Sequence, residues 1–529
     1  MTDPAVLPAW GTQVKRGTVH GHPCLMYASR PRAVADFLLS ARRWPGRELL
    51  VQGKRRLTAG EHEAAVARVA RWLSGLGVRP GSRVVLLGFN SVEWVAAFWA
   101  TQALGAVAVL GNAWWTDDEV TAALTPAEPE LVITDRAVSW PSVSFAEVRA
   151  LVDSADDEAV LPRWPADEDA LAVIMFSSGT TGAPKGVLMS HRAVVANIHN
   201  LLVLTGRLPS ALPDDHPGTV SMLSVPLFHL AGIQVCCTTL LTGGRLVFLE
   251  GRFDPAEVLR LIETERVRSW GCIPTMVSRV LDHPDFARTD TSSVTSIPMG
   301  GAPVGDDLRA RIAAAFSGVK SRVGSLYGLT EAGGVLAAAA GKDVTSRPGC
   351  VGRALPVVEL RISAPDATGT GQIQARTPTA TGGYLGDPDD IADADGWISS
   401  GDLGRIDADG WLYVTGRLKD IIIRGGENIA SAHVEEALQR HPDVVEVAVV
   451  GLPHQDLGEE VGAAVVLRPA ATASDADLAR YVAGALASFE RPTKWWRRGA
   501  PLPTGPSGKI LRREVREEWL ARGGGDLPD

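Results

Sequence analysis

The chain has 529 residues, 45% of them hydrophobic and 21% charged, and its formal net charge is −9. This length exceeds what one hydrophobic core usually organises, so we expect at least two domains. The mild negative charge disfavours nucleic acid or an anionic membrane surface as the main partner. The apolar stretches are far shorter than the ~20 residues of a spanning helix, so we expect no transmembrane segment.

The amino terminus and the cysteines indicate a cytoplasmic protein. Residues 1–11 lack the basic start and apolar run of a secretory signal. The cysteines show neither CxxC spacing nor paired spacing with histidine; they are Cys24, Cys236, Cys237, Cys272 and Cys350. Scattered cysteines in odd number suit a reducing compartment, where we expect each to be a free, buried thiol.

Helical and strand patterns alternate through the first part of the chain. One helical face within 61–90 would carry Ala65, Val66, Val69, Trp72, Leu73 and Leu76. A continuous apolar strand, "RVVLLGF", follows at 83–89, and Ser91 is the expected N-cap of the next helix. Thr116 and Glu119 have the spacing of a capping box that opens a further helix. Alternating helices and apolar strands predict α/β layers with parallel sheet.

The predicted secondary structure changes in the later part of the chain. From Gly352 to Gly416, short strands and Gly/Asp turns predict a small β-rich subdomain. After Arg417 the patterns indicate a compact α+β tail. We therefore predict an α/β protein with two domains. Residues 1–417 would form a large part of layered α/β subdomains plus the β-rich subdomain, and 418–529 a small mobile α+β domain.

A segment of small residues follows the apolar strand "LAVIMF" at 171–176. It reads "SSGTTGAPKG" over 177–186. Its glycines permit tight turns, its hydroxyls can donate, and Lys185 adds a positive charge, so the loop could cradle a polyphosphate. It is not the common P-loop, which needs GxxxxGK followed by Ser or Thr. From these residues alone, a flexible surface loop is an equal alternative.

Together with six later motifs, this loop resembles the signatures of the adenylate-forming superfamily, which includes acyl-CoA and aryl-CoA synthetases. The motifs are "PLFHLAG" from Pro226, "GGAPV" from Gly300, "YGLTEAGG" from Tyr327, "GWISSGDLG" from Gly396, "GRLKDIIIRGGENI" from Gly416 and "PTGPSGKILR" from Pro503. The resemblance spans roughly 80–515. It implies that a carboxylate and Mg·ATP give acyl-AMP and pyrophosphate, after which a nucleophile takes the acyl group.

The resemblance implies a nucleotide site assembled from several motifs. The residues matching its phosphate loop are Ser177, Ser178, Gly179, Thr180, Thr181, Gly182 and Lys185. Those matching its adenine-binding segments are Gly301, Ala302, Pro303, Tyr327 and Gly328. Asp402 and Arg417 match the residues that hold the ribose. Family members usually read Thr-Gly-Asp there, whereas this chain has Ser400 in place of the threonine.

The same resemblance implies three catalytic residues and a hinge. Thr330 would reach phosphate and Glu331 would bind Mg²⁺, a cation that prefers oxygen ligands. Lys509 would bridge the carboxylate and the α-phosphate while negative charge develops. Lys419 matches the hinge, where rotation would carry Lys509 away from the site. That rotation would bring the acceptor-tunnel residues to the site, which are Gly425 and Gly426.

The acyl pocket is implied to include His229, Gly300 and Gly333. We favour a wall or gate role for His229 over a chemical one. No acidic residue follows the "PLF" segment, which disfavours an α-amino acid as substrate. The run "GGVLAAAAG" at 333–341 is small and apolar, so it could leave room for a bulky ring or a medium chain, although such a run could equally be a packed helix.

CoA is the expected acceptor, and an amine remains open as a second acceptor. Ser431 replaces the usual proline and His433 the usual first glutamate of the family's "GGENIYPAEVE" segment. A luciferase-like monooxygenase has no supporting residue, and intact Lys509 disfavours a non-catalytic adenylate-binding protein. The expected partners are therefore a small apolar carboxylic acid, ATP and a thiol or amine acceptor. The chain would be a monomer or homodimer.

Overall fold

The computed structural model describes most of the chain. The described residues are 9–156, 159–164, 167–178, 184–300, 306–319, 323–339, 343, 346–347, 349–387, 391–469, 471–505 and 509–524.

The first layered unit is a six-stranded sheet in the order β10-β9-β6-β5-β7-β8. All its neighbouring strands are parallel except the β10–β9 pair. Its strands are β5 (Arg83–Leu87), β6 (Val107–Gly111), β7 (Leu131–Thr134), β8 (Ser142–Val143), β9 (Leu171–Ser178) and β10 (Pro184–Ser190). The helices interleaved with them are α2 (Ala59–Gly75), α3 (Val92–Ala103), α4 (Asp117–Leu124) and α5 (Phe145–Val152). Every residue of β6 is buried, which confirms the reading of continuous apolar runs as parallel strands.

The helix starts follow the expected capping chemistry. Ser91 accepts a hydrogen bond from the backbone of Trp94, and Thr116 and Glu119 form the predicted capping box. The prediction for Leu76 is wrong, because α2 ends at Gly75 and Leu76 is 48% exposed. A helical periodicity has no meaning beyond the residue where the helix ends.

A second sheet has the order β13-β11-β12-β3-β4. Only its β3–β4 pair is antiparallel. Its strands are β3 (Glu48–Gln52), β4 (Arg55–Thr58), β11 (Val220–Leu223), β12 (Arg245–Phe248) and β13 (Ser269–Gly271). The helices of this region are α1 (Asp36–Ala41), α6 (His191–Leu204), α7 (Leu230–Leu241), α8 (Pro255–Thr264), α9 (Pro274–Leu281) and α10 (Asp306–Ala315), with 3-10 turns η1 (Pro209–Ala211) and η2 (Phe286–Arg288). The apolar faces of α8, α9 and α10 share one buried core with this sheet.

The β-rich unit is a larger sheet than the sequence indicates. Its eight strands have the order β14-β15-β16-β17-β21-β20-β19-β18. They are β14 (Ile297–Gly300), β15 (Val323–Leu329), β16 (Gly334–Ala339), β17 (Cys350–Ala354), β18 (Glu359–Ser363), β19 (Gly371–Arg376), β20 (Ile398–Ile406) and β21 (Trp411–Arg417). The sheet therefore begins well before Gly352. The alanine run forms buried strand β16, so the packed-helix alternative is wrong. Pairing with β15 and β17 overrides alanine's helical propensity there.

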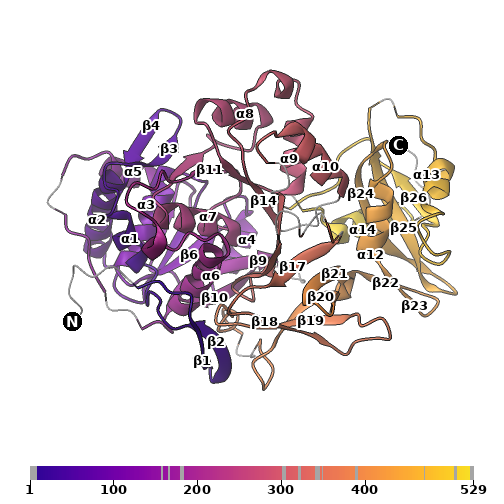
Figure 1. The fold of residues 1–529 in the computed structure, drawn as a ribbon, viewed down its shortest axis with the longest axis horizontal. Coiled ribbons are helices and arrows are strands. Elements are labelled where there is room, and N and C mark those ends of the chain that lie inside the picture. The colour runs from indigo at the N-terminus through magenta and orange to yellow at the C-terminus, as the bar shows by residue number, and fades with distance from the viewer. Residues whose placement is uncertain are drawn as a thin grey trace.

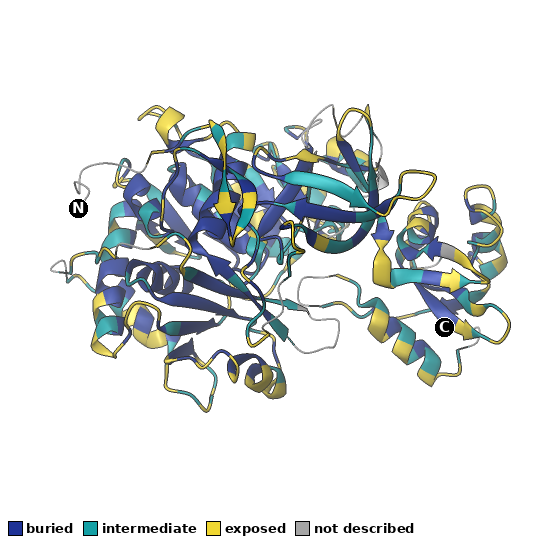
Figure 2. Ribbon diagram, turned by 90° about the horizontal axis from the view of Figure 1, so that it is seen from below, coloured by how far each residue is buried: buried dark blue, intermediate teal, exposed yellow. Residues whose placement is uncertain are grey.

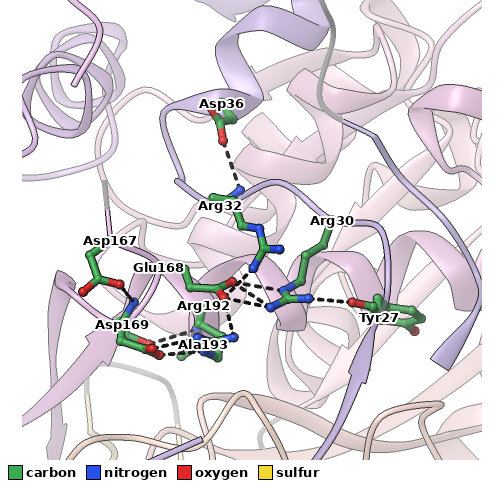
Figure 3. Close-up of polar contacts among 10 residues, drawn as sticks. Tyr27, Arg30, Arg32, Asp36, Asp167, Glu168, Asp169, Arg192 and Ala193 are labelled. Carbon is green, nitrogen blue, oxygen red and sulfur yellow. Dashed lines mark hydrogen bonds and ion pairs between the residues drawn. The ribbon is translucent and has the colours of Figure 1, made fainter. Parts of the chain in front are cut away.

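Ion pairs connect the N-terminal segment to the first unit. Strands β1 (Val14–Val19) and β2 (His22–Tyr27) form a hairpin, and a cluster of ion pairs follows it (Figure 3). Glu168 lies 2.8 Å from Arg30 and 2.7 Å from Arg192, and Arg192 also pairs with Asp169 at 2.6 Å. Since Arg30 is buried, removing Glu168 would leave a poorly solvated cation there, whereas Arg192 would keep Asp169.

The elements after Arg417 gather at one end of the molecule (Figure 1). The 3-10 turn η3 (Leu418–Asp420) leads into a mostly antiparallel sheet of order β23-β22-β25-β24, with β26 beside β25. The elements are β22 (Ile421–Arg424), β23 (Glu427–Ala430), β24 (Val444–His454), β25 (Gly458–Leu467), β26 (Lys494–Arg497), α12 (Ser431–Gln439), α13 (Asp475–Val482) and α14 (Arg512–Ala521). This part has buried cores of its own, visible as dark ribbon inside the smaller lobe of Figure 2.

All five cysteines are buried free thiols, as predicted. In the parts of the chain that the structure describes, no helix has the length and apolar character needed to cross a membrane.

Candidate active site

Three of the predicted nucleotide residues meet within the eight-stranded sheet. Asp402 on β20 lies opposite Arg417 on β21, and Arg417 Nε is 3.2 Å from Asp402 Oδ1. Tyr327 on β15 donates its phenol proton to Asp402 Oδ2 over 2.8 Å. Asp402 is buried, and its backbone N–H donates to the hydroxyl of Ser400. The serine in place of threonine therefore keeps the local turn. Burial, reinforced by the Asp402 charge, raises the pKa of Tyr327 above its ordinary value.

The Thr330–Glu331 pair lies in the turn that joins β15 to β16. Glu331 is held through its backbone, since its carbonyl accepts from Thr381 N–H at 3.1 Å. Gly333 closes the turn with φ +68°, and a Cβ there would collide with the carbonyl of Thr379. Gly333, which the resemblance assigns to the acyl pocket, thus has a backbone reason to be glycine.

Tyr384 joins this turn to the phosphate loop, and the sequence analysis missed it. Its hydroxyl donates to Glu331 Oε1 at 3.3 Å, and Lys185 Nζ lies 5.0 Å from its ring centre. The Tyr384 segment pairs with β10, where Leu385 N–H donates to the Gly186 carbonyl at 2.7 Å. Burial and then Glu331 raise the Tyr384 pKa to about 12, so the phenol is a donor at neutral pH. A tyrosine in a turn-rich stretch carries no local signal of these contacts.

Lys509 faces the same site from the C-terminal part. It lies on a loop whose base is closed by a Thr504–Ile510 bridge and by a 2.8 Å bond from Gly505 N–H to the Lys509 carbonyl. The residue keeps access to solvent, while the surrounding protein desolvates its amine. Burial, followed by the Arg417 charge, lowers the Lys509 pKa, and Asp402 and Glu331 oppose that change. The lysine is therefore within electrostatic range of residues from three other motifs.

His229 immediately precedes α7 and is neutral at physiological pH. Burial, then the charge of Lys509, lowers its pKa to about 4. Its Nε2 is buried and has no hydrogen-bond partner among the described residues. Its ring centre lies 4.8 Å from that of Phe228. A neutral imidazole with an unsatisfied nitrogen is compatible with a wall that contacts substrate, and it does not favour acid–base chemistry by an imidazolium.

A pocket of about 180 Å³ lies beside Phe228 and reaches the base of the Lys509 loop at Thr504 and Gly505. Trp114 forms its aromatic side, with its ring centre 5.4 Å from those of both Phe89 and Phe228. Arg252 and Arg279 also line it, and both are exposed. No sequence motif pointed to this arginine pair. A larger hollow of about 360 Å³, over α1 and α2, shares no residue with any motif.

Other predicted residues lie elsewhere or were not described. Lys419 is exposed on η3. Gly425 and Gly426 form the exposed β22–β23 turn at φ +58° and +90°, and no contact in the described chain joins them to the site. Gly300 ends β14 beside Leu326, Gly328 packs against the Gly334 backbone, and Ser177 and Ser178 end β9. The predicted residues outside the described chain are Gly179, Thr180, Thr181, Gly182, Gly301, Ala302 and Pro303.

A metal here would depend on few protein ligands. The described residues contain no group of three or more His, Cys, Asp or Glu suited to hold an ion. Glu331 offers a carboxylate whose Oε1 accepts, within the described chain, a single long bond of 3.3 Å from Tyr384. One carboxylate combined with substrate phosphates is a usual environment of Mg²⁺, so the residues present fit that ion.

Comparison with known proteins agrees with this geometry. A family model described as AMP-binding enzyme matches residues 37–385, and one described as AMP-binding enzyme C-terminal domain matches 433–509. The chain belongs to the AMP-binding enzyme family. It is an AMP-forming acid–CoA ligase, which converts a carboxylic acid and ATP into an acyl adenylate and then an acyl-CoA.

Two relatives and two solved structures show the extent of the similarity. A feruloyl-CoA synthase from an Amycolatopsis species is 35% identical over 494 residues, covering 90% of this chain and 97% of its own. 4-Coumarate–CoA ligase 2 from Petroselinum crispum is 30% identical over 501 residues, covering 89% and 90%. ATP-bound MatB from Rhodopseudomonas palustris superposes with a TM-score of 0.81 at 28% identity, covering 91% and 99%. o-Succinylbenzoate CoA synthetase from Bacillus subtilis, bound to its acyl-adenylate, gives 0.78 at 27%, covering 91% and 97%.

Proposed function

We propose that this AMP-binding enzyme activates an apolar aromatic carboxylic acid, of the arylpropenoate type, and transfers it to CoA in the cytoplasm. The observation that supports the proposed site is the electrostatic influence of Arg417, Asp402 and Glu331 on Lys509, which relates four separate motifs, together with the 3.2 Å pairing of Arg417 with Asp402. A lysine on a terminal loop is otherwise a solvated surface residue. Its position among nucleotide-binding candidates supports a function in the adenylation step.

Each residue would meet one need of that step. Asp402, with Arg417 and Tyr327 attached, would hold the ribose hydroxyls. Glu331 would hold Mg²⁺, which supplies charge neutralisation for the phosphates. Thr180, Thr181, Lys185 and Thr330 would contact the phosphates. Lys509 would donate to the carboxylate and α-phosphate oxygens as the acyl–phosphate bond forms and pyrophosphate leaves.

Two features favour an aromatic acid. The relatives that are 35% identical over 90% of the chain are named feruloyl-CoA synthases. Strand β16, next to the Glu331 turn, is rich in buried glycine and alanine, and such small side chains would leave space for a ring. A fatty acid is the second candidate, because a long-chain-fatty-acid–CoA ligase of Mycobacterium tuberculosis is 31% identical over 492 residues.

CoA is favoured over an amine as acceptor. The 180 Å³ pocket combines an aromatic wall with Arg252 and Arg279, a lining suited to a phosphate-bearing thiol that must reach the Lys509 loop. The departure at Ser431, which kept an amine acceptor open, has another explanation. The Ser431 hydroxyl donates to the Asp420 carbonyl at 2.8 Å, and the residue is buried.

The test is AMP and pyrophosphate release from purified protein with Mg·ATP. Ferulate, 4-coumarate, benzoate and decanoate would each be run alone, with CoA, and with mixed amino acids. We expect CoA-stimulated turnover with ferulate or 4-coumarate, and a thioester in the mass spectrum. Turnover with decanoate alone would move the substrate class to fatty acids, and stimulation by amino acids alone would support amide formation. Silence across the panel with ATP still bound would favour a non-catalytic adenylate-binding protein.

A further inference from the structure

Arg512 joins three segments of the C-terminal part. It is the first residue of α14, three positions after Lys509. Its Nε and Nη2 pair with the two carboxylate oxygens of Glu435 on α12, at 2.7 and 2.5 Å. Its Nη1 lies 2.9 Å from Asp420 Oδ2 at the end of η3. A guanidinium that uses three nitrogens on two half-buried carboxylates fixes both distance and orientation.

The end of the hinge turn is held from a second direction. Asp420 follows Lys419, and its carbonyl accepts from Ser431 Oγ at 2.8 Å. Ser431 is 3% exposed and begins α12. Glu435, on the same helix, also accepts from the Val449 N–H at 2.9 Å, so α12 is fixed to β24. Asp420 is therefore attached to the C-terminal body through both its side chain and its backbone.

The base of the catalytic loop is attached at the same point. Leu511 N–H donates to the Pro503 carbonyl at 2.9 Å, which closes the loop immediately before Arg512. Any shift of Arg512 relative to Glu435 would move this closed base, and with it Lys509. By contrast, Arg417 and Lys419, just before Asp420, are exposed.

We propose that Arg512 is a positioning residue that ties the Lys509 loop to Asp420 at the end of the hinge, so that Asp420, α12 and the loop turn as one body. The hinge freedom is then confined to residues 417–419. Lys509 reaches the nucleotide site in one defined position, because the pairing of Arg512 with Glu435 and Asp420 fixes the distance of Lys509 from the hinge. This inference rests on the proposed function only for its kinetic part.

The first test needs no substrate. Arg417 and Lys419 are exposed trypsin sites in the hinge, so limited trypsinolysis reports how firmly the hinge is held. Arg512→Gln leaves Glu435 and Asp420 without their cation, and we expect hinge cleavage to be roughly tenfold faster, the scale of lost charge-assisted hydrogen bonds. The matched control is Arg513→Gln, since Arg513 is exposed and its ion pair among the described residues is a long one, with Glu517 at 3.6 Å. Equal cleavage in wild type and both variants would overturn the proposal.

The second test divides the two half-reactions, with ferulate as the probe acid. A displacement of about 1 Å at a reacting group can cost ~100-fold, so Arg512→Gln should lower the rate of adenylation at least ~10-fold. The KM for ATP and the transfer from supplied feruloyl-AMP to CoA should stay within about threefold. Asp420→Asn, which keeps the shape of the turn, should show the same pattern more weakly, and Arg512→Lys should restore only part of the rate.

These outcomes separate this proposal from the proposed function. Inactive wild-type protein would count against ferulate activation. The trypsin result would still show whether the pairing of Arg512 with Glu435 and Asp420 holds the hinge. Equal loss of both half-reactions in folded Arg512→Gln and Asp420→Asn would overturn the positioning role and indicate general destabilisation. If Arg512→Gln does not fold, as circular dichroism would show, Asp420→Asn and Arg512→Lys decide the question alone.

Discussion

The phenol of Tyr327 donates to Asp402 Oδ2 at 2.8 Å, although 75 positions of chain separate the two residues. The pair joins the strand that would contact adenine to the carboxylate that would hold ribose. We expect Tyr327→Phe to raise the KM for ATP about tenfold and leave kcat within twofold, because it removes a hydrogen bond to a charged acceptor but keeps the ring. Steady-state kinetics would measure this.

Tyr413→Phe, which removes a Tyr–Asp contact in the same sheet, should change neither constant. If it raised the KM for ATP as much as Tyr327→Phe does, the cause would be a loss of sheet stability instead.

Tyr384 gives a prediction about Mg²⁺. Tyr384→Phe keeps the aromatic face under Lys185 and removes the donor to Glu331. We expect the Mg²⁺ concentration for half-maximal adenylation to rise several-fold, since a donor hydrogen-bonded to a ligating carboxylate orients that carboxylate toward the metal. Calorimetric titration of ATP, with and without Mg²⁺, provides a readout that does not depend on turnover. An unchanged Mg²⁺ dependence in both experiments would show that the 3.3 Å contact has no function in metal binding.

The hinge gives a prediction about which of the two half-reactions is slowed more. Proline at position 419 fixes φ and restricts Leu418, so it should resist the dihedral change needed for rotation. Lys419→Pro should therefore slow transfer to CoA much more than formation of the adenylate, measured as single half-reactions. Lys419→Ala serves as the control, because it removes the same side chain and leaves the backbone free. Equal losses in both half-reactions would argue against a hinge at this residue.

Three buried histidines, together with partly buried His229, should make the protein sensitive to acid. Burial lowers the pKa of His62, His191, His199 and His229 to about 4. The unfolded chain binds these protons near pH 6.5, so stability should be complete above that pH and decline as pH falls toward 4. Each histidine adds a slope of up to about 1.4 kcal/mol per pH unit in that window.

Urea unfolding at pH 7.5, 6.0 and 5.0 would measure this decline. His62→Leu should lower the slope of the unfolding free energy against pH by the amount that one proton contributes. His62 is fully buried, and burial alone shifts its pKa. The same substitution at exposed His20 is the control for a histidine change at the surface. A wild-type stability that is flat between pH 7.5 and 5.0 would contradict the neutral, buried state of these rings.

Local signals made much of the fold predictable. The caps at Ser91 and Thr116 and the apolar runs of the parallel strands depend on neighbours within a few residues, so the sequence displays them. Apart from Leu76, which lies just beyond the end of α2, the errors arose where distant pairing decides. Strand β16 is alanine-rich, and only its partners β15 and β17 make it a strand.

The site divides in the same way. Asp402, Glu331 and Lys509 stand in short local motifs, and it is the order of these motifs along the chain that carries the resemblance. Tyr384 and Arg512 act through contacts that close over long sequence separations, such as the 77 positions between Arg512 and Glu435. No local pattern specifies such a contact, which is why the sequence analysis missed Tyr384 and attributed Ser431 to the acceptor side.

The most direct test of the account is a comparison of wild type and Lys509→Ala in the two half-reactions separately, with ferulate, Mg·ATP and CoA. Adenylation would be followed as pyrophosphate release, and transfer would be followed from supplied feruloyl-AMP. We expect the variant to lose adenylation by ~1,000-fold or more, while it binds ATP and transfers the acyl group to CoA almost normally. Adenylation at the wild-type rate, or equal loss of both steps, would contradict the assignment of Lys509 and with it the proposed site.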